Sequence, residues 1–163
     1  MAVLIFMDGV IRKERDQSII LDGSALYKSL NENYRVLLLA KDKERTDVWL
    51  KTNNLAKNID DIVQIEDSPL GDNELRTVEM SRSKGKVDFV VTDNTDLATK
   101  LLEVGITVMV FLNPRYARPE FRPDGRAGVK SWTAITEELD KQQGLYVDDG
   151  RLVELPALDD FED

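Results

Sequence analysis

The chain has 163 residues, with 22 Lys and Arg against 31 Asp and Glu, and contains neither Cys nor His. These absences exclude disulfides, Ser-His-Asp and Cys-His catalysis, and zinc or copper sites built on thiolate or imidazole. Any bound metal would be a hard cation on oxygen ligands, most plausibly Mg²⁺. The net charge of −9 argues against duplex DNA as a partner, because phosphate neutralisation is the main source of that affinity.

The length fits one globular domain with a core that needs no covalent cross-link. No run approaches the roughly 20 apolar residues of a membrane helix. The apolar stretch 2–7 is too short for a signal peptide and has no basic residues before it. We therefore expect a cytoplasmic protein with no membrane contact.

Apolar runs and helical patterns alternate along the chain. Buried strands are predicted over Ala2–Phe6, Val36–Ala40, Val87–Thr92 and Ile106–Leu112, with a short additional strand within Ile59–Ile65. Helices are predicted over Ser24–Asn31, Asp47–Leu55, Asn73–Arg82, Thr95–Val104 and Ser131–Gln142. This alternation predicts an α/β fold, a Rossmann-like three-layer sandwich with a mostly parallel central sheet.

Three segments depart from this alternation. Residues 11–21 begin with five charged side chains and end in three apolar ones, which predicts a β-hairpin flap over the end of the first strand. Residues 113–130 hold three of the five prolines and four arginines, so they form a long Pro/Arg loop. We expect Gly144 to end the last helix of a domain spanning 1–144.

Residues 145–163 form an acidic C-terminal tail with seven acidic side chains and one basic one. Within it, an Asp-Gly pair stands between alternating residues from Tyr146 to Val153, which predicts a short hairpin. Three roles stay open for this tail: a solvated segment that aids solubility, a motif for a partner, or a segment that docks on the Pro/Arg loop of the same chain.

Acidic residues follow three of the four main strands. In parallel sheets the carboxyl ends of the strands meet at one edge, where ligands bind. The acidic side chains brought to this edge are Asp8, Asp42, Asp93 and Asp96.

The run Val-Leu-Ile-Phe-Met-Asp-Gly-Val-Ile over residues 3–11 resembles the first motif of the haloacid dehalogenase (HAD) superfamily. The second strand with Ala40 and the third strand with Asp93 to Asp96 resemble that superfamily's second and fourth motifs in order and spacing. The resemblance covers residues 2–112 and implies a HAD-like fold without a cap domain, because no insert is large enough to be one.

In active members of this superfamily the first Asp of the first motif attacks phosphorus, and a second Asp two residues later protonates the leaving group. Aligning Gly9 and Val10 with the family's Gly-Val places Asp8 at the second position and Phe6 at the first. Phenylalanine can neither form an aspartyl-phosphate nor bind magnesium. Ala40 also lacks the hydroxyl that the second motif supplies for the phosphoryl group.

The other family positions are only partly filled. Lys84 and Lys86 are the candidates for the third-motif lysine, and Lys41 is a further candidate for ligand contact. Asp93 and Asp96, with Asp8, are the expected ligands of a magnesium ion.

Alternatives to these family roles stay open. A second alignment makes Asp8 itself the nucleophile, with Val10 two places on. Asp8 also suits a turn or a helix cap, and Asp93 suits the N-cap of the helix that follows it.

The Pro/Arg loop interleaves Arg115 and Arg118 with Tyr116 and, further on, Phe121. Such a pattern can bind phosphate and stack a base, as in single-stranded nucleic-acid sites. We favour the alternative in which the rings anchor the loop and the arginines pair with acidic surface groups.

The region from Phe111 to Gln142, including Arg-Pro-Asp-Gly-Arg at 122–126 and Ser131-Trp132, resembles small uncharacterised proteins of actinobacterial phages. This likeness implies no activity. It implies a host-cytoplasmic location if the protein is phage-encoded.

Two functions follow from these observations. The leading hypothesis is a degenerate, catalytically inactive HAD-like domain that binds a protein partner or a phosphorylated ligand. The alternative is a magnesium-dependent capless phosphatase that uses Asp8, Asp93 and Asp96 on nucleotide or macromolecular phosphates.

Overall fold

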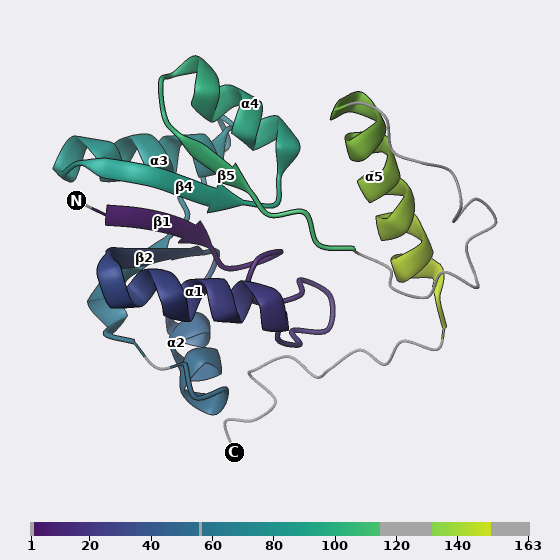
Figure 1. Ribbon diagram of the computed structural model, residues 1–163, viewed down its shortest axis with the longest axis horizontal. Coiled ribbons are helices and arrows are strands. Elements are labelled where there is room, and N and C mark those ends of the chain that lie inside the picture. The colour runs from purple at the N-terminus through teal and green to yellow at the C-terminus, as the bar shows by residue number, and fades with distance from the viewer. Residues whose placement is uncertain (1, 56, 115–131, 151–163) are drawn as a thin grey trace. The chain divides into compact units, whose positions relative to one another are not determined.

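Figure 1 shows the computed structural model, which describes residues 2–55, 57–114 and 132–150. Five parallel strands form one sheet in the order β3-β2-β1-β4-β5. The strands are β1 (Ala2–Phe6), β2 (Arg35–Ala40), β3 (Ile62–Gln64), β4 (Val87–Thr92) and β5 (Val108–Val110). The predicted α/β fold with a parallel central sheet is confirmed.

The helices lie on both faces of this sheet, as the ribbon drawing shows (Figure 1). They are α1 (Leu21–Asn33), α2 (Lys43–Thr52), α3 (Asn73–Lys84) and α4 (Thr95–Glu103), with one turn of 3₁₀ helix, η1 (Ile59–Asp61). Together the sheet and these helices make the three layers of a Rossmann-like sandwich. They form one compact unit of the chain, and a fifth helix belongs to another.

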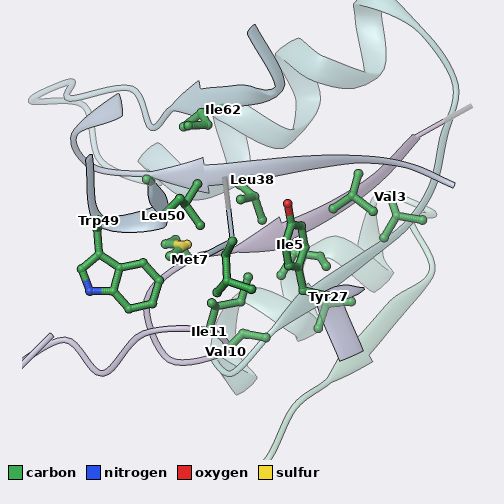
Figure 2. Packing of buried hydrophobic residues seen from close by; sticks show 14 residues of the cluster. Val3, Ile5, Met7, Val10, Ile11, Tyr27, Leu38, Trp49, Leu50 and Ile62 are labelled. Atoms are coloured by element: carbon green, nitrogen blue, oxygen red, sulfur yellow. The ribbon is translucent and has the colours of Figure 1, made fainter. Parts of the chain in front are cut away.

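The core is divided by the sheet into two apolar clusters. On one face, Tyr27 of α1 and Trp49 and Leu50 of α2 pack against Ile5 and Leu38 (Figure 2). The other cluster joins α3 and α4 to the sheet through Leu4, Phe6, Leu39, Val78, Val90, Leu97 and Leu101. Successive side chains of β1 therefore point to opposite faces, and both faces of this central strand are buried.

Two predicted strands and two helix starts need correction. The strand predicted over Ile106–Leu112 is observed as β5 (Val108–Val110), which is only three residues long. It begins later than predicted because the turn at Gly105 (φ 79°) and the buried Ile106 precede it. Ile59–Ile65 divides into η1 and β3. Both α1 and α2 begin earlier than predicted.

These early starts have local causes. The Asp42 side chain caps α2 by accepting a hydrogen bond from the Arg45 backbone N–H at 3.1 Å. At the start of α1, Gly23 lies so close to the Val10 carbonyl that a Cβ there would stand 1.6 Å from its oxygen. The start of α1 thus packs directly on the turn that follows β1.

The segment predicted as a flap forms a turn with one antiparallel bridge, between Arg12 and Ile19, and contains no named strand. The Lys13 backbone N–H donates to the Ser18 carbonyl at 2.8 Å. The Trp49 indole N–H donates to the Gln17 carbonyl at 2.7 Å. This turn is therefore tied to α2.

The fifth helix, α5 (Trp132–Asp148), continues through Gly144. The predicted stop at Gly144 is wrong, because a glycine inside a helix costs only about 1 kcal/mol relative to alanine. Buried side chains recur at helical spacing on both sides of it, at Leu139, Gln142 and Tyr146. The hairpin predicted over Tyr146–Val153 is wrong for residues 146–148, which are helical. Residues 151–153 lie outside the described residues.

None of the helices in the described ranges has the length and apolar character needed to cross a membrane.

Phe6→Ala is expected to lower the free energy of unfolding by about 3–5 kcal/mol, because Phe6 is only 4% exposed within the α3–α4 cluster. Leu102→Ala on the exposed surface of α4 is the control and is expected to cost less than about 0.5 kcal/mol. Urea denaturation measures both values. A Phe6→Ala cost as small as that of the control would contradict the placement of this ring in the core.

Candidate functional site

The turn after β1 is closed by backbone hydrogen bonds at the carboxyl edge of the sheet. The Met7 carbonyl accepts from the N–H groups of Ile11 and Arg12, both at 3.1 Å, and the Gly9 N–H donates to the Arg12 carbonyl at 2.8 Å. This tight turn holds Asp8 two residues beyond the buried Phe6.

Asp8 is engaged by a buried arginine. The Arg12 Nε donates to the Asp8 Oδ1 at 2.8 Å, and the two side chains are 10% and 21% exposed. The Arg12 guanidinium also lies over the Trp49 ring, 5.6 Å from its centroid. An arginine so buried needs a carboxylate partner, because an unpaired charge in this position would be costly. The carboxylate of Asp8 therefore has a structural role.

Asp93, which follows β4, lies directly against Gly9. A Cβ built on Gly9 would stand 2.0 Å from the Asp93 Oδ2, and the Gly9 φ of 89° favours glycine. The proposed N-cap role of Asp93 is wrong: Asn94 caps α4, with its side chain accepting from the Asp96 and Leu97 N–H groups. The turn after β1 and the aspartate after β4 are thus neighbours.

A cavity of about 600 Å³ opens at the same edge, between the ends of β2 and β3 and the first turns of α3 and α4. Its charged lining residues are Lys41, Glu66, Asp67, Asp72, Glu74, Asp96 and Lys100. Asn73 and Asn94 add amide groups, and three apolar side chains, Ile65, Leu75 and Leu97, complete the wall. Five carboxylates against two ammonium groups give this lining a formal charge of −3.

Both lysines of the cavity have acidic partners. The Lys41 Nζ donates to the Glu14 Oε1 at 2.9 Å, and this hydrogen bond raises the pKa of Lys41 despite partial burial. The Lys100 Nζ donates to the Asp72 Oδ1 at 2.5 Å. Each ammonium group also interacts with a further carboxylate of the lining, Lys41 with Glu74 and Lys100 with Asp96.

Glu74 faces Lys41 from the first turn of α3. Burial raises the pKa of Glu74 above its ordinary value, although a hydrogen bond from the Asn94 side chain and the charge of Lys41 oppose this shift. The negative charges of Glu14 and Asp8 raise it further. A cation entering the cavity would therefore favour the ionised form of Glu74.

The predicted site residues are only partly brought together. Lys41 and Asp96 line the cavity, and Asp8 and Asp93 lie beside it in the β1 turn and after β4. Lys84 and Lys86 lie before β4, at the opposite end of the sheet from these residues. Arg115 and Arg118 lie outside the described residues.

No group of three or more acidic side chains within 2–55, 57–114 and 132–150 is arranged to hold a metal ion. Asp8, Asp93 and Asp96 accordingly do not form such a group, and the magnesium site stays a prediction.

Of the acidic side chains that line the cavity, only Asp96 was predicted as a site residue from the sequence. Glu66 and Asp67 follow β3, the short strand that was predicted within Ile59–Ile65, and Glu74 lies in the first turn of α3. Considering the carboxyl end of this fifth strand together with those of the four main strands would have pointed to Glu66 and Asp67.

No known protein-family model matches the chain, and no curated protein shows significant similarity to it.

Gly9→Ala is expected to destabilise the protein more than Gly71→Ala. Both glycines have positive φ, 89° and 81°, but a Cβ at Gly71 meets nothing within 4 Å. The Gly71 change therefore measures the backbone cost alone, on the order of 1–3 kcal/mol, whereas Gly9→Ala must also displace the Asp93 carboxylate. Chemical denaturation measures the two losses.

In an Asp93→Ala background the Gly9→Ala and Gly71→Ala changes are expected to lower the free energy of unfolding by similar amounts, because the carboxylate that obstructs a Cβ at Gly9 is absent. Equal losses for the two glycine variants in the wild-type background would show that Asp93 does not constrain this turn.

Proposed function

We propose that the chain is a HAD-like domain that acts by binding and has no phosphatase activity. The observation that carries this proposal is Phe6, which occupies the position of the family's nucleophile and is buried among Leu4, Leu39 and other apolar side chains of the α3–α4 cluster. Phosphoryl transfer through an aspartyl-phosphate requires a carboxylate at that position.

Two neighbouring features support the same conclusion. The buried Ala40 ends β2 where the family has a hydroxyl for the phosphoryl group. The Asp8 carboxylate is bound to Arg12 at 2.8 Å, so it is poorly placed to exchange a proton with a leaving group. Phe6, Asp8 and Ala40, which align with the first two motifs, are therefore all engaged in the structure of the domain.

The binding site is the cavity at the carboxyl edge of the sheet, and its ligand is a protein partner or a phosphorylated compound. Lys41, Lys100 and the first turns of α3 and α4 supply positive charge for a phosphate group. The carboxylates of the lining favour a partner that brings positive charge. The volume of about 600 Å³ lies within the usual range for ligand sites.

A magnesium-dependent phosphatase is the second candidate. The close approach of Asp93 to Gly9 favours it, because this contact places the fourth-motif aspartate beside the turn that carries Asp8. In that case Asp8 would be the nucleophile, and it would have to leave Arg12.

Hydrolysis of p-nitrophenyl phosphate and of nucleoside monophosphates with Mg²⁺ separates these candidates. The wild-type chain and its Asp8→Asn variant are both expected to show no turnover above buffer. The exposed acid Asp22 on α1 supplies the matched control, Asp22→Asn. Wild-type turnover that Asp8→Asn abolishes and Asp22→Asn retains would overturn the binding proposal.

A further inference from the structure

Arg12 has hydrogen-bond donors left over after its pairing with Asp8. The residue is only 8% exposed, and a guanidinium carries several N–H donors. Its Nε–H donates to the Asp8 Oδ1, whereas Nη1 and Nη2 make no hydrogen bond to a residue within 2–55, 57–114 or 132–150. Buried polar groups in proteins are nearly always hydrogen-bonded. These two groups therefore call for an acceptor that the described chain does not supply.

We propose that Arg12 binds a carboxylate group of a ligand at the carboxyl edge of the sheet, through the Nη1 and Nη2 groups of its guanidinium. This inference rests on the proposed function, because it assumes that the edge binds rather than catalyses. It adds a carboxylate to the chemistry of the ligand.

The two Nη groups are open to a ligand. The Arg12 side chain is 10% exposed, and neither Nη atom is among the described side-chain nitrogens and oxygens that are fully enclosed without a partner. They therefore reach solvent in the turn after β1, at the edge where the carboxyl ends of the strands meet. Ligands of parallel α/β sheets bind at this edge.

The guanidinium is held in one orientation from two sides. Asp8 accepts its Nε–H, and the guanidinium carbon lies over the Trp49 ring, 5.6 Å from the ring centroid. Trp49 is fixed in turn by its hydrogen bond to the Gln17 carbonyl at 2.7 Å. A guanidinium fixed in this way can donate two parallel hydrogen bonds to a carboxylate, and little side-chain entropy is lost on binding.

The charge around Arg12 favours a carboxylate over a phosphate. Asp8 already balances the positive charge of Arg12, and the Asp93 carboxylate lies against Gly9 in the same turn. Repulsion from these two carboxylates increases in proportion to the charge of the ligand. A monoanionic carboxylate therefore meets less repulsion than a phosphate dianion, while its two oxygens match the paired Nη donors.

The fluorescence of Trp49 reports on this site, because the guanidinium that would bind the carboxylate lies over its ring. The chain has two tryptophans, so Trp132→Phe leaves Trp49 as the only one. In this background the full-length chain is titrated with N-acetylglycine, a monocarboxylate, and separately with inorganic phosphate. Both titrations are made at constant ionic strength.

Two matched arginine variants are compared in the same background. Arg12→Lys keeps a positive charge beside Asp8 but removes the paired Nη donors. Arg35→Lys is the control, because Arg35 is also paired with an aspartate, Asp61, but is 66% exposed and begins β2 at the opposite end of the strand. Thermal denaturation checks that both variants are folded.

N-acetylglycine is expected to give a saturable change in Trp49 emission. Its Kd is expected to rise about tenfold in Arg12→Lys, because a charge-assisted hydrogen bond is lost, and to change less than about twofold in Arg35→Lys. Absence of a saturable response in the Trp132→Phe chain would overturn the inference, and this result needs no Arg12 variant to fold. An unchanged Kd in a folded Arg12→Lys variant, or tighter binding of phosphate than of N-acetylglycine, would overturn it as well.

A blocked peptide with one internal glutamate distinguishes the two sources of a carboxylate. Tighter binding of this peptide than of N-acetylglycine supports a protein partner, and weaker binding supports a small carboxylic acid. Absence of any Trp49 response together with absence of hydrolysis overturns the carboxylate site and leaves a non-catalytic domain. Hydrolysis that depends on Asp8 overturns the proposed function whatever the carboxylate does.

Discussion

The buried guanidinium of Arg12 organises the carboxyl edge of the sheet. It binds the Asp8 carboxylate, lies over the Trp49 ring, and belongs to a residue whose backbone closes the turn after β1 and bridges to Ile19. A cation this buried is stable only with its partner in place. This ion pair therefore acts together with the Trp49–Gln17 hydrogen bond to hold the segment after β1 against α2.

This ion pair also decides what the edge can do. It engages the Asp8 carboxylate, while Phe6, two residues earlier, is part of the core. The remaining acidic groups gather around the cavity and include Glu74 and Asp96. An edge at which Asp8 is held in an ion pair and Phe6 is buried is suited to binding rather than to catalysis, which is the role that we propose.

The sheet was the most predictable part of the fold. β1 was predicted to the residue because it is a continuous apolar run, and β4 because it is apolar apart from Asp88 and the final Thr92, patterns that need no tertiary information. The start of α1 was missed because Leu21 is exposed and interrupts the amphipathic pattern. The continuation of α5 through Gly144 was missed because a glycine is a common stop but not an obligatory one.

The candidate site was predictable only where it follows long strands. Lys41 was found at the end of β2 and Asp96 shortly after β4, but the acids after the three-residue β3 and in the first turn of α3 were not. The contact between Gly9 and Asp93 joins residues far apart in sequence, so no local pattern could distinguish it from an N-cap. Pairing of Asp8 with Arg12 likewise depends on burial beside Trp49.

A double-mutant cycle of Asp8→Asn and Arg12→Met, read by urea denaturation, tests most directly whether Asp8 is structural. The contact of Arg12 with Trp49 is lost in both the single Arg12→Met variant and the double variant, so its energy cancels in the coupling energy. A coupling energy of about 1–3 kcal/mol is expected, larger than that of the exposed pair Asp72–Lys100, whose interaction is screened by solvent. Additive effects within about 0.5 kcal/mol would contradict the structural role of Asp8 and leave its carboxylate available for chemistry.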